Sequence, residues 1–344
     1  MTTTPPSAQE ATPPDDEWTL FHGDGRPRPR TSMPAAPPWR RFAGRRAGSD
    51  TATADPTPGD GESGKNGFGR SYIIGPEEID VVNAALHLRR PLLVTGHPGT
   101  GKSSLARAIA HELVLGPVLH WPVNSRSSLQ EALYRYDAIG RLQQRTISGP
   151  AESDNRDIGT YIRLGPVGTA LVPSTRPRVL LIDELDKGDI DLPNDLLTVL
   201  EEGAFDITEL SRLPDLVDPV KVLTADPHQH VEVPRGQVHC TEFPIVVITS
   251  NGERDFPPAF RRRCIPLYLP EPGGERLRDI IEAHLGSEAA DEAHDIVTAF
   301  LNRRNSGELA TDQLLNAVFL RRGGTTLDPE KLLRVVLHRL SGVV

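Results

Sequence analysis

The stretch Gly-His-Pro-Gly-Thr-Gly-Lys-Ser at residues 96–103 decides the fold of this chain. The apolar residues 91–95 precede it and predict a short buried strand, and residues 104–113 follow it with apolar side chains at helical spacing. A strand, a glycine-rich loop ending in Lys-Ser and a helix, in this order, form the setting that a phosphate-binding loop requires. The alternative is a Gly-Pro turn that merely carries a lysine, and it does not account for both flanking elements.

The loop predicts a nucleotide site with a bound metal ion. Its glycines let backbone N–H groups turn inward around phosphate oxygens, and the start of the following helix adds a partial positive charge. We expect Lys102 to reach the β- and γ-phosphates and the Ser103 hydroxyl to ligate Mg²⁺. The residues expected to bind the nucleotide phosphates are Gly96, His97, Pro98, Gly99, Thr100, Gly101, Lys102, Ser103 and Ser104.

Two carboxylates follow a second apolar run, at residues 179–182. Four apolar residues ending in Asp183 and Glu184 are typical of a buried parallel strand whose carboxyl end delivers acids to a crevice. Acids that cap a helix after a strand are the structural alternative. Because a phosphate loop lies earlier in the chain, we interpret Asp183 as the acid that holds Mg²⁺ and Glu184 as the base that accepts a proton from the attacking water.

A further buried strand is predicted for residues 243–251, and it ends in polar side chains. We expect Asn251 to lie beside the strand that ends in the two carboxylates, where its amide would hold the γ-phosphate or orient water. A short helix over residues 257–264 comes next and ends in Arg261, Arg262 and Arg263. Such a cluster is usually a solvated basic face.

The fold class expected from these elements is α/β, with an αβα P-loop NTPase core and a parallel sheet. A helix over residues 76–88 leads into the first strand, residues 117–123 form another strand, and residues 220–233 suggest a hairpin. We expect the core to span residues 71–270, with an exposed excursion at 137–165. Helical segments near residues 275–285, 289–304, 312–321 and 329–340 predict a small all-α domain over residues 271–344.

Residues 1–70 are rich in Pro, Thr, Ser, Ala, Gly, Asp and Arg and have no sustained apolar period. Such a segment cannot bury enough surface to offset its ordering entropy, so we expect a disordered tail. The stretch from Arg26 to Arg46 contains several arginines and no acidic residue. Composition leaves open whether this stretch docks on an acidic partner or nucleic acid, or has no defined partner. These arginines are Arg26, Arg28, Arg30, Arg40, Arg41, Arg45 and Arg46.

The bulk properties narrow the function classes. The chain has 344 residues and a formal net charge of −9, which argues against a dedicated nucleic-acid binder. Its two cysteines allow at most one disulfide bond and fit a reducing compartment. No apolar run approaches membrane-spanning length, and no secretory signal pattern is present at the start, so we expect a cytosolic protein without a membrane partner.

With these motifs in order, residues 71–344 resemble AAA+ ATPases of the MoxR type. Residues 96–103 resemble the Walker A motif and residues 179–184 Walker B. Asn251 matches sensor 1, and the arginines before Cys264 match the arginine-finger position. The segment Tyr72-Ile73-Ile74-Gly75 resembles the short apolar-Gly element that packs the adenine in such proteins, and Ile74 and Gly75 are expected to bind the nucleotide. Residues 137–166 and the hairpin at 220–240 stand where the MoxR-like clade carries its helix-2 insert and its pre-sensor-1 hairpin.

The resemblance implies an ATP-binding αβα domain with a helical lid, assembled into a ring that is expected to be a hexamer. ATP with Mg²⁺ would bind between neighbours, and Arg263, helped by Arg262, would reach into the adjacent subunit's site. The chain departs from the family in having no arginine at the sensor 2 position, near residues 308–315. Either that role is missing, or another lid arginine supplies it: Arg303, Arg304 or Arg321.

The leading functional hypothesis is an ATP-hydrolysing, ring-forming chaperone or remodeller of partner proteins. The resemblance alone suggests von Willebrand factor A domain proteins as partners. A nucleotide-controlled switch or scaffold with little turnover is an alternative, although Glu184 would have no use there. A nucleic-acid-directed motor is another, and only the arginine-rich tail speaks for it.

Overall fold

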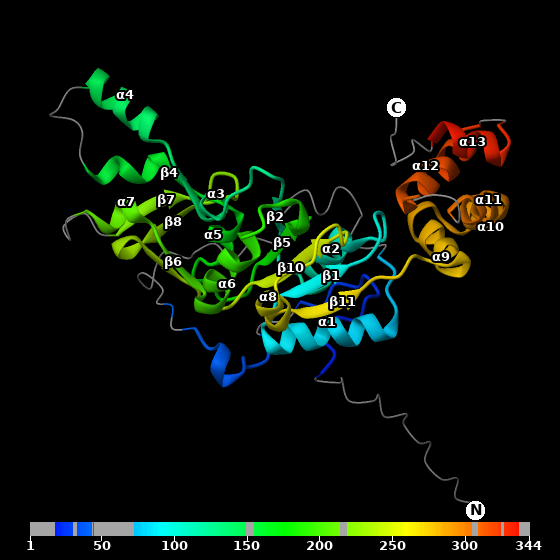
Figure 1. Ribbon diagram of the computed structural model, residues 1–344, viewed down its shortest axis with the longest axis horizontal. Coiled ribbons are helices and arrows are strands. Elements are labelled where there is room, and N and C mark those ends of the chain that lie inside the picture. The colour runs from blue at the N-terminus through cyan, green and yellow to red at the C-terminus, as the bar shows by residue number, and fades with distance from the viewer. Residues whose placement is uncertain are drawn as a thin grey trace, which may run out of the picture.

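The computed structural model describes residues 18–29, 33–42, 44, 72–148, 155–213, 219–304, 309–324 and 327–336. Its centre is a five-stranded sheet in which every neighbouring pair runs parallel, in the order β11-β1-β10-β5-β2 (Figure 1). The predicted parallel sheet is confirmed. Its strands are β1 (Leu92–Thr95), β2 (Leu119–Pro122), β5 (Val179–Asp183), β10 (Ile245–Ser250) and β11 (Ile265–Tyr268).

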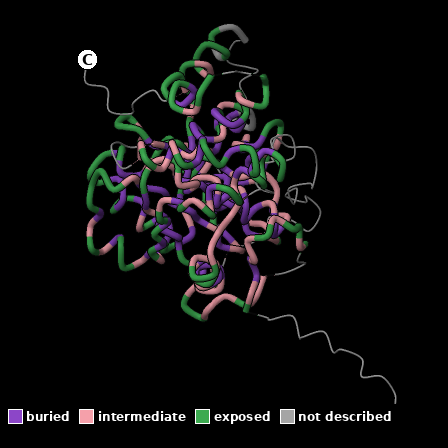
Figure 2. The backbone as a smooth tube through the Cα atoms, turned by 90° about the vertical axis from the view of Figure 1, so that its right-hand side faces the viewer, coloured by how far each residue is buried: buried purple, intermediate pink, exposed green. Residues whose placement is uncertain are grey.

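Helices cover both faces of this sheet, because its strands are apolar on both sides. Val179 and Leu181 pack with helices α1 (Pro76–Leu88) and α2 (Lys102–Glu112), whereas Leu180 and Ile182 pack on the opposite face. A strand buried on both faces carries a continuous apolar run instead of an alternating one. Figure 2 shows the buried residues gathered in the interior. The helices of the second face are α3 (Leu129–Leu133), α5 (Pro166–Ala170), α6 (Leu192–Glu202) and α8 (Pro258–Arg263).

A smaller four-stranded sheet, in the order β3-β4-β7-β8, extends the core. Its strands are β3 (Tyr134–Tyr136), β4 (Ile162–Leu164), β7 (Val220–Leu223) and β8 (His230–Val233). The antiparallel pairing of β7 with β8 confirms the predicted hairpin. Strands β6 (Ala204–Asp206) and β9 (Gln237–His239) form a separate antiparallel pair, and the short helix α7 (Thr208–Ser211) follows β6.

The predicted excursion at residues 137–165 is exposed in only one part. Helix α4 (Ala138–Ser148) projects from the core, and its Ile139 and Leu142 side chains are 70% and 67% exposed (Figure 1). After the 3-10 helix Asn155–Tyr161, strand β4 returns to the core with Ile162 and Leu164 buried. The expectation of exposure is therefore wrong for β4, because β4 is a strand of the second sheet. Residues 149–154 lie outside the described residues.

The predicted all-α domain is confirmed for the described part of the C-terminal region, and it has an apolar core of its own. Its helices are α9 (Gly274–Leu285), α10 (Ser287–Glu292), α11 (His294–Arg304), α12 (Thr311–Arg322) and α13 (Pro329–Val336). The single helix expected over residues 289–304 is thus divided between α10 and α11. Across the described segments, no helix combines the length and apolar character needed to span a bilayer.

The expectation that residues 1–70 are disordered is wrong for residues 18–29 and 33–42. Leu20 and Phe21 are fully buried against α1 and α2. The buried side chain of Asn83 accepts hydrogen bonds from both of their N–H groups, at 2.8 and 2.9 Å, and donates to the Phe21 carbonyl oxygen. Glu112, also fully buried, accepts from the N–H of Gly23 at 3.0 Å. Side chains of α1 and α2 therefore supply hydrogen-bond partners for the backbone groups of this extended segment, which pairs with no strand in the described part of the chain.

Two arginines of the described N-terminal segment contact the core of this chain. Arg28 pairs with Asp24 at 2.6 Å and with Glu112 at 3.2 Å. Arg40 donates to the carbonyl oxygens of Arg89 and Leu200. The sequence left open whether the arginine-rich part docks on an acidic partner or nucleic acid or has no defined partner. Arg28 and Arg40 do neither, because their partners are groups of this chain. Arg30, Arg45 and Arg46 lie outside the described part of the chain.

Candidate functional site

The phosphate loop joins β1 to α2 at the carboxyl edge of the parallel sheet. Gly101 is the N-cap of α2 and has a φ of +87°, and a Cβ there would lie 3.1 Å from the Tyr72 ring. Gly99 has a φ of +77°, and a Cβ there would lie 2.5 Å from the Cβ of Ala310, just before α12. Only glycine meets both demands without strain, since each position combines left-handed backbone with a close neighbour. The loop therefore touches the all-α domain directly.

Lys102 points back into the loop. Its ammonium donates to the carbonyl oxygens of Gly96 and His97, at 2.7 and 2.8 Å, and its side chain is buried. Burial lowers the pKa of Lys102, and the nearby carboxylates of Asp186, Asp183 and Glu184 oppose that shift. A phosphate oxygen would offer this ammonium an anionic acceptor at the same place.

Asp183 is the most heavily hydrogen-bonded of the predicted acids. Its Oδ1 accepts hydrogen bonds from Ser103 Oγ at 2.6 Å and from Thr249 Oγ1 at 2.7 Å, and the second of these joins β10 to β5. His120 Nε2 lies 3.2 Å from Oδ2. Burial alone would raise the pKa of Asp183, but hydrogen bonds with His120, Ser103 and Thr249 outweigh it and lower that pKa to about 2. The carboxylate is therefore ionised at neutral pH.

The residues predicted to hold Mg²⁺ fit that ion. Ser103 and Asp183 bring a hydroxyl and an ionised carboxylate into direct contact. Mg²⁺ prefers oxygen ligands and is usually held by one or two carboxylates, waters and substrate phosphates instead of a cage made only of protein groups. Two adjacent oxygen donors at the mouth of a phosphate loop meet this requirement.

Glu184 lies next to Asp183 and is held from two sides. Its backbone has a φ of +59°, and its N–H donates to Thr249 Oγ1 at 2.8 Å. Its carboxylate accepts from Asn251 Nδ2 at 3.3 Å and pairs with Lys187 Nζ at 2.9 Å. A left-handed backbone at a non-glycine residue costs free energy and is frequent at functional sites. The predicted pair of Glu184 with Asn251 is thus brought together.

Asp186 fixes the end of β10 against the end of β5. Its buried carboxylate oxygen Oδ2 accepts from the N–H groups of Asn251 and Glu253, at 3.0 and 3.1 Å. The sequence interpretation did not include Asp186, Thr249, His120 or Lys187 in the site. A signal existed for Thr249, because it stands two residues before Asn251 and so faces the same side of the strand.

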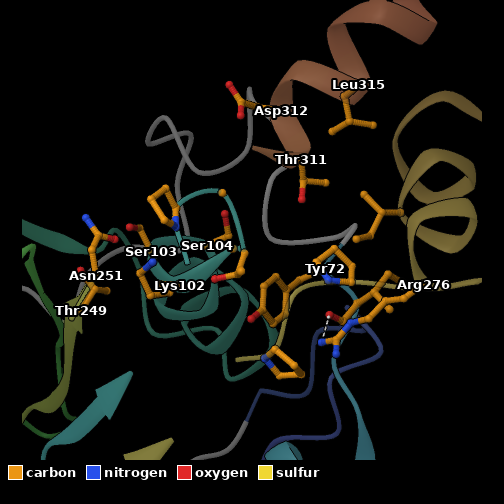
Figure 3. A pocket seen from close by; sticks show the side chains of 18 of the residues that line it. Tyr72, Lys102, Ser103, Ser104, Thr249, Asn251, Arg276, Thr311, Asp312 and Leu315 are labelled. Atoms are coloured by element: carbon orange, nitrogen blue, oxygen red, sulfur yellow. Dashed lines mark hydrogen bonds between the residues drawn. The ribbon is translucent and has the colours of Figure 1, made fainter. Parts of the chain in front are cut away.

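A cavity of about 360 Å³ lies between this centre and the all-α domain (Figure 3). Pro98 to Ser104 of the loop line one side together with Asp183, Glu184, Thr249 and Asn251. Tyr72 and Ile73 line it farther out, next to residues of α9 and α12. The predicted adenine element at residues 72–75 is thus brought to the cavity only in its first half, because Ile74 packs in the core beneath and Gly75 caps α1. The lining residues from the all-α domain are Arg276, Ile280, His284, Thr311, Asp312 and Leu315.

Arg276 of α9 is the arginine that the all-α domain brings to the cavity. Its guanidinium donates to the carbonyl oxygen of Ile73 at 3.1 Å and to Glu78 at 3.2 Å. Arg304 donates instead to Pro272 and Arg321 to Asp295, and within the described residues neither they nor Arg303 line the cavity. The three arginines considered for the sensor 2 role are thus not brought to the cavity.

The arginines of α8 lie away from the cavity of their own chain. Arg263 forms an ion pair with Glu201 of α6 and also donates to the carbonyl oxygen of Ala259 at 3.3 Å. Arg261 and Arg262 are exposed. In the described part of the chain, none of the three lines the cavity. The structure therefore separates Arg262 and Arg263 from the residues around Lys102.

The parallel sheet, the phosphate loop and the acids beside it define a P-loop NTPase. Residues 91–264 match the AAA domain family, dynein-related subfamily, and the chain belongs to that family. The matched region begins just before β1 and ends just before β11, so it covers strands β1, β2, β5 and β10 of the parallel sheet and ends before the all-α domain.

Solved structures of NtrX from Brucella abortus resemble the chain weakly. The complex with ATP has 16% sequence identity and a TM-score of 0.40, over 76% of this chain and 56% of that chain. The complex with ADP has 16% identity and a TM-score of 0.36, over 76% of this chain and 55% of that chain. The chain thus spans little more than half the length of these NtrX chains. No curated protein sequence matches it.

Proposed function

We propose that this protein hydrolyses ATP as a MoxR-like AAA+ ATPase. One observation carries the proposal: Ser103 and Asp183 are in contact at 2.6 Å beside the phosphate loop, while Asn251 holds Glu184 next to them. A seat for phosphate, two oxygen ligands for a metal ion and a positioned carboxylate are the parts that a nucleotide hydrolase needs.

The residues of the chain divide the work. The loop N–H groups and Lys102 bind the β- and γ-phosphates, and Ser103 and Asp183 hold Mg²⁺, which when bound neutralises charge on the phosphate oxygens. Glu184 takes the proton from the attacking water. Asn251 and the Thr249 hydroxyl hold Glu184 by its carboxylate and by its backbone N–H, so they keep the base in place.

Part of the site comes from a neighbouring subunit in this proposal. An arginine donates to the charge that develops on the γ-phosphoryl group, and the described α8 arginines are absent from the lining of their own cavity. Arg263, helped by Arg262, therefore acts in the next subunit of a ring, with a hexamer as the expected size. Arg263 has to leave Glu201 to do so.

The biological role we propose is remodelling of partner proteins, including von Willebrand factor A domain proteins. Helix α4 and the β7–β8 hairpin support a MoxR-like type, since they stand where that clade carries its insert and its hairpin. Helix α4 also projects exposed apolar side chains, which a partner protein would cover. Two buried free cysteines fit action in the reducing cytoplasm.

A nucleotide-controlled switch with little turnover is the second candidate. It is favoured by the ion pair of Glu184 with Lys187 at 2.9 Å, which engages the carboxylate that should activate water. A nucleic-acid-directed motor is not favoured, because the chain has a net charge of −9 and because Arg28 and Arg40 are used internally.

A measurement of phosphate release from ATP distinguishes a hydrolysing ATPase from a nucleotide-controlled switch with little turnover. Glu184→Gln should bind ATP with the wild-type affinity, while phosphate release falls by ~100-fold or more because the general base is lost. Glu202→Gln is the matched control, since Glu202 is an exposed glutamate of α6 outside the cavity. Release by Glu184→Gln at the wild-type rate would refute Glu184 as the base, and no release by the wild type would favour the switch.

The same variant tests the proposed role. Glu184→Gln loaded with Mg²⁺ and ATP should retain its client, so purified von Willebrand factor A domain protein is the probe. Retention that requires ATP and is lost in Lys102→Ala supports remodelling of such partners. Equal retention with and without ATP would contradict it.

A further inference from the structure

The N-terminal segment reaches the part of the surface that carries Arg263. Residues 33–42 cross from α1 to α6 and include a short 3-10 helix, Pro38–Arg40. A hollow of about 240 Å³ is lined there by Trp39 and Arg40 of this segment and by Glu201, Phe260 and Arg263 of the core. Residues 33–42 form an arm that lies outside the family match. The shared AAA domain therefore does not account for the position of the arm.

Arg40 fixes the arm to the core. Its guanidinium donates to the carbonyl oxygen of Arg89, at 2.9 and 3.1 Å, and to that of Leu200 at 3.3 Å. It also lies over the Phe243 ring, 4.4 Å from the centroid, and Phe42 stacks on the same ring. These contacts join the arm to the C-cap of α1 and to the last turn of α6.

The last turn of α6 also carries the residue that holds Arg263. Glu201 follows Leu200 directly and forms the ion pair with Arg263. Arg40 and Arg263 are therefore attached to adjacent residues of one helix turn. The arm and the arginine of α8 thus contact the same turn of α6 and line the same hollow.

Trp39 remains exposed although its neighbours are fixed. Its side chain is 78% exposed, next to Arg40 and within the hollow that Arg263 lines. Trp and Arg are enriched among the residues that dominate binding at protein interfaces, and a rigid backbone lowers the entropy lost on binding. The arm thus presents a large apolar contact beside the arginine.

We propose that the arm is part of the subunit interface, and that Trp39 docks on the next copy of this chain to position Arg263 at that copy's nucleotide cavity. The inference rests on the proposed function. Charge supports a second copy as the occupant: the hollow is lined by the exposed Arg90 and the half-buried Arg263, whereas the cavity of a copy would hold a triphosphate and is lined by the exposed Asp312.

A mixing experiment tests the direction of this contact. Arg263→Ala subunits keep an intact cavity, and Glu184→Gln subunits keep an intact arginine, so mixtures should hydrolyse ATP where the second type donates to the first. Adding Trp39→Ala to the Glu184→Gln donor should lower phosphate release by ~10-fold, as expected for a central interface tryptophan. Adding it to the Arg263→Ala acceptor should lower release by less than about twofold, because the arm of the acceptor faces away from the productive contact.

Trp18→Ala in the donor is the matched control. Trp18 is the other exposed tryptophan of the described N-terminal segment, and it stacks on His87 of α1 at 4.7 Å, away from the hollow. This variant should leave the activity of the mixture unchanged. Thermal melts of all variants check that the subunits fold.

The outcomes separate the inference from the proposed function. No recovery in the parental mixture, with co-assembly shown by light scattering, would contradict the shared site itself. Recovery that is insensitive to Trp39→Ala in the donor, or equally sensitive in donor and acceptor, would overturn the docking role of Trp39 and leave the shared site standing. Tryptophan emission gives a second measurement, since Trp39 should shift to shorter wavelength when subunits assemble, and an unshifted spectrum would contradict its burial.

Discussion

The two sides of the cavity are built differently. On the core side, Ser103, Asp183, Glu184, Thr249 and Asn251 form one hydrogen-bonded network between the loop and two strands of a single sheet. On the side of the all-α domain, the lining combines the apolar Ile280 and Leu315 with polar side chains of two helices, and Arg276 bonds this domain to Ile73 and Glu78 of the core. From this difference we expect residues of the core side to act in the chemistry and the all-α domain to set how tightly the nucleotide is held.

Removing the charge of the core side should have the largest effect on binding. Lys102→Ala should weaken ATP binding by up to ~100-fold, because the phosphates lose a charge-assisted hydrogen bond. Isothermal titration with ATP measures this. Lys221→Ala, at an exposed lysine of β7 outside the cavity, is the control and should bind as the wild type. Equal affinity of both variants would remove the phosphate-loop assignment.

Breaking the network without removing charge should affect turnover more than affinity. Thr249→Val keeps the shape of the side chain but deprives Asp183 of a donor and the Glu184 N–H of its acceptor, so turnover at saturating ATP should fall by ~10-fold. Thr169→Val is the control, because it removes an equally buried hydroxyl that accepts from Ala225 away from the cavity. A loss shared by both variants would indicate general destabilisation.

The side of the all-α domain should show the smallest effect, and of the opposite kind. Arg276→Ala removes the bonds to Ile73 and Glu78, so ATP affinity should fall by ~2–10-fold while turnover at saturation stays near the wild-type value. Arg278→Ala on the same helix pairs only at the surface, with Asp291, and serves as control. A large loss of turnover in Arg276→Ala would break the division between the two sides.

Local sequence patterns were sufficient for the centre of the site. The loop from Gly96 to Ser103 and the acids Asp183 and Glu184 can each be recognised from the apolar strand that directly precedes them. All of them lie at the carboxyl edge of the sheet, as predicted. Thr249, Asp186 and His120 were missed because their roles depend on which strands are neighbours. That order, β10 beside β5 and β5 beside β2, is a property of the sheet and not of any one segment.

The remaining errors have the same origin in tertiary contacts. Of the predicted adenine element, Tyr72 and Ile73 line the cavity, but Ile74 packs in the core and Gly75 caps α1. Residues 18–29 have no periodic pattern, yet Asn83 and Glu112 hold their backbone, and both partners lie more than 60 residues away in sequence. Arg276 entered no sequence motif, because its place at the cavity depends on tertiary bonds from α9 to Ile73 and Glu78.

The central claim is that the chain hydrolyses ATP in a site completed by a neighbouring subunit. The most direct measurement is phosphate release per subunit across a range of protein concentrations, with mass followed by light scattering on the same samples. The account predicts that release per subunit rises steeply as the protein assembles, and that Arg263→Ala removes this rise without preventing assembly. Full release by the isolated subunit, unchanged on assembly, would contradict it.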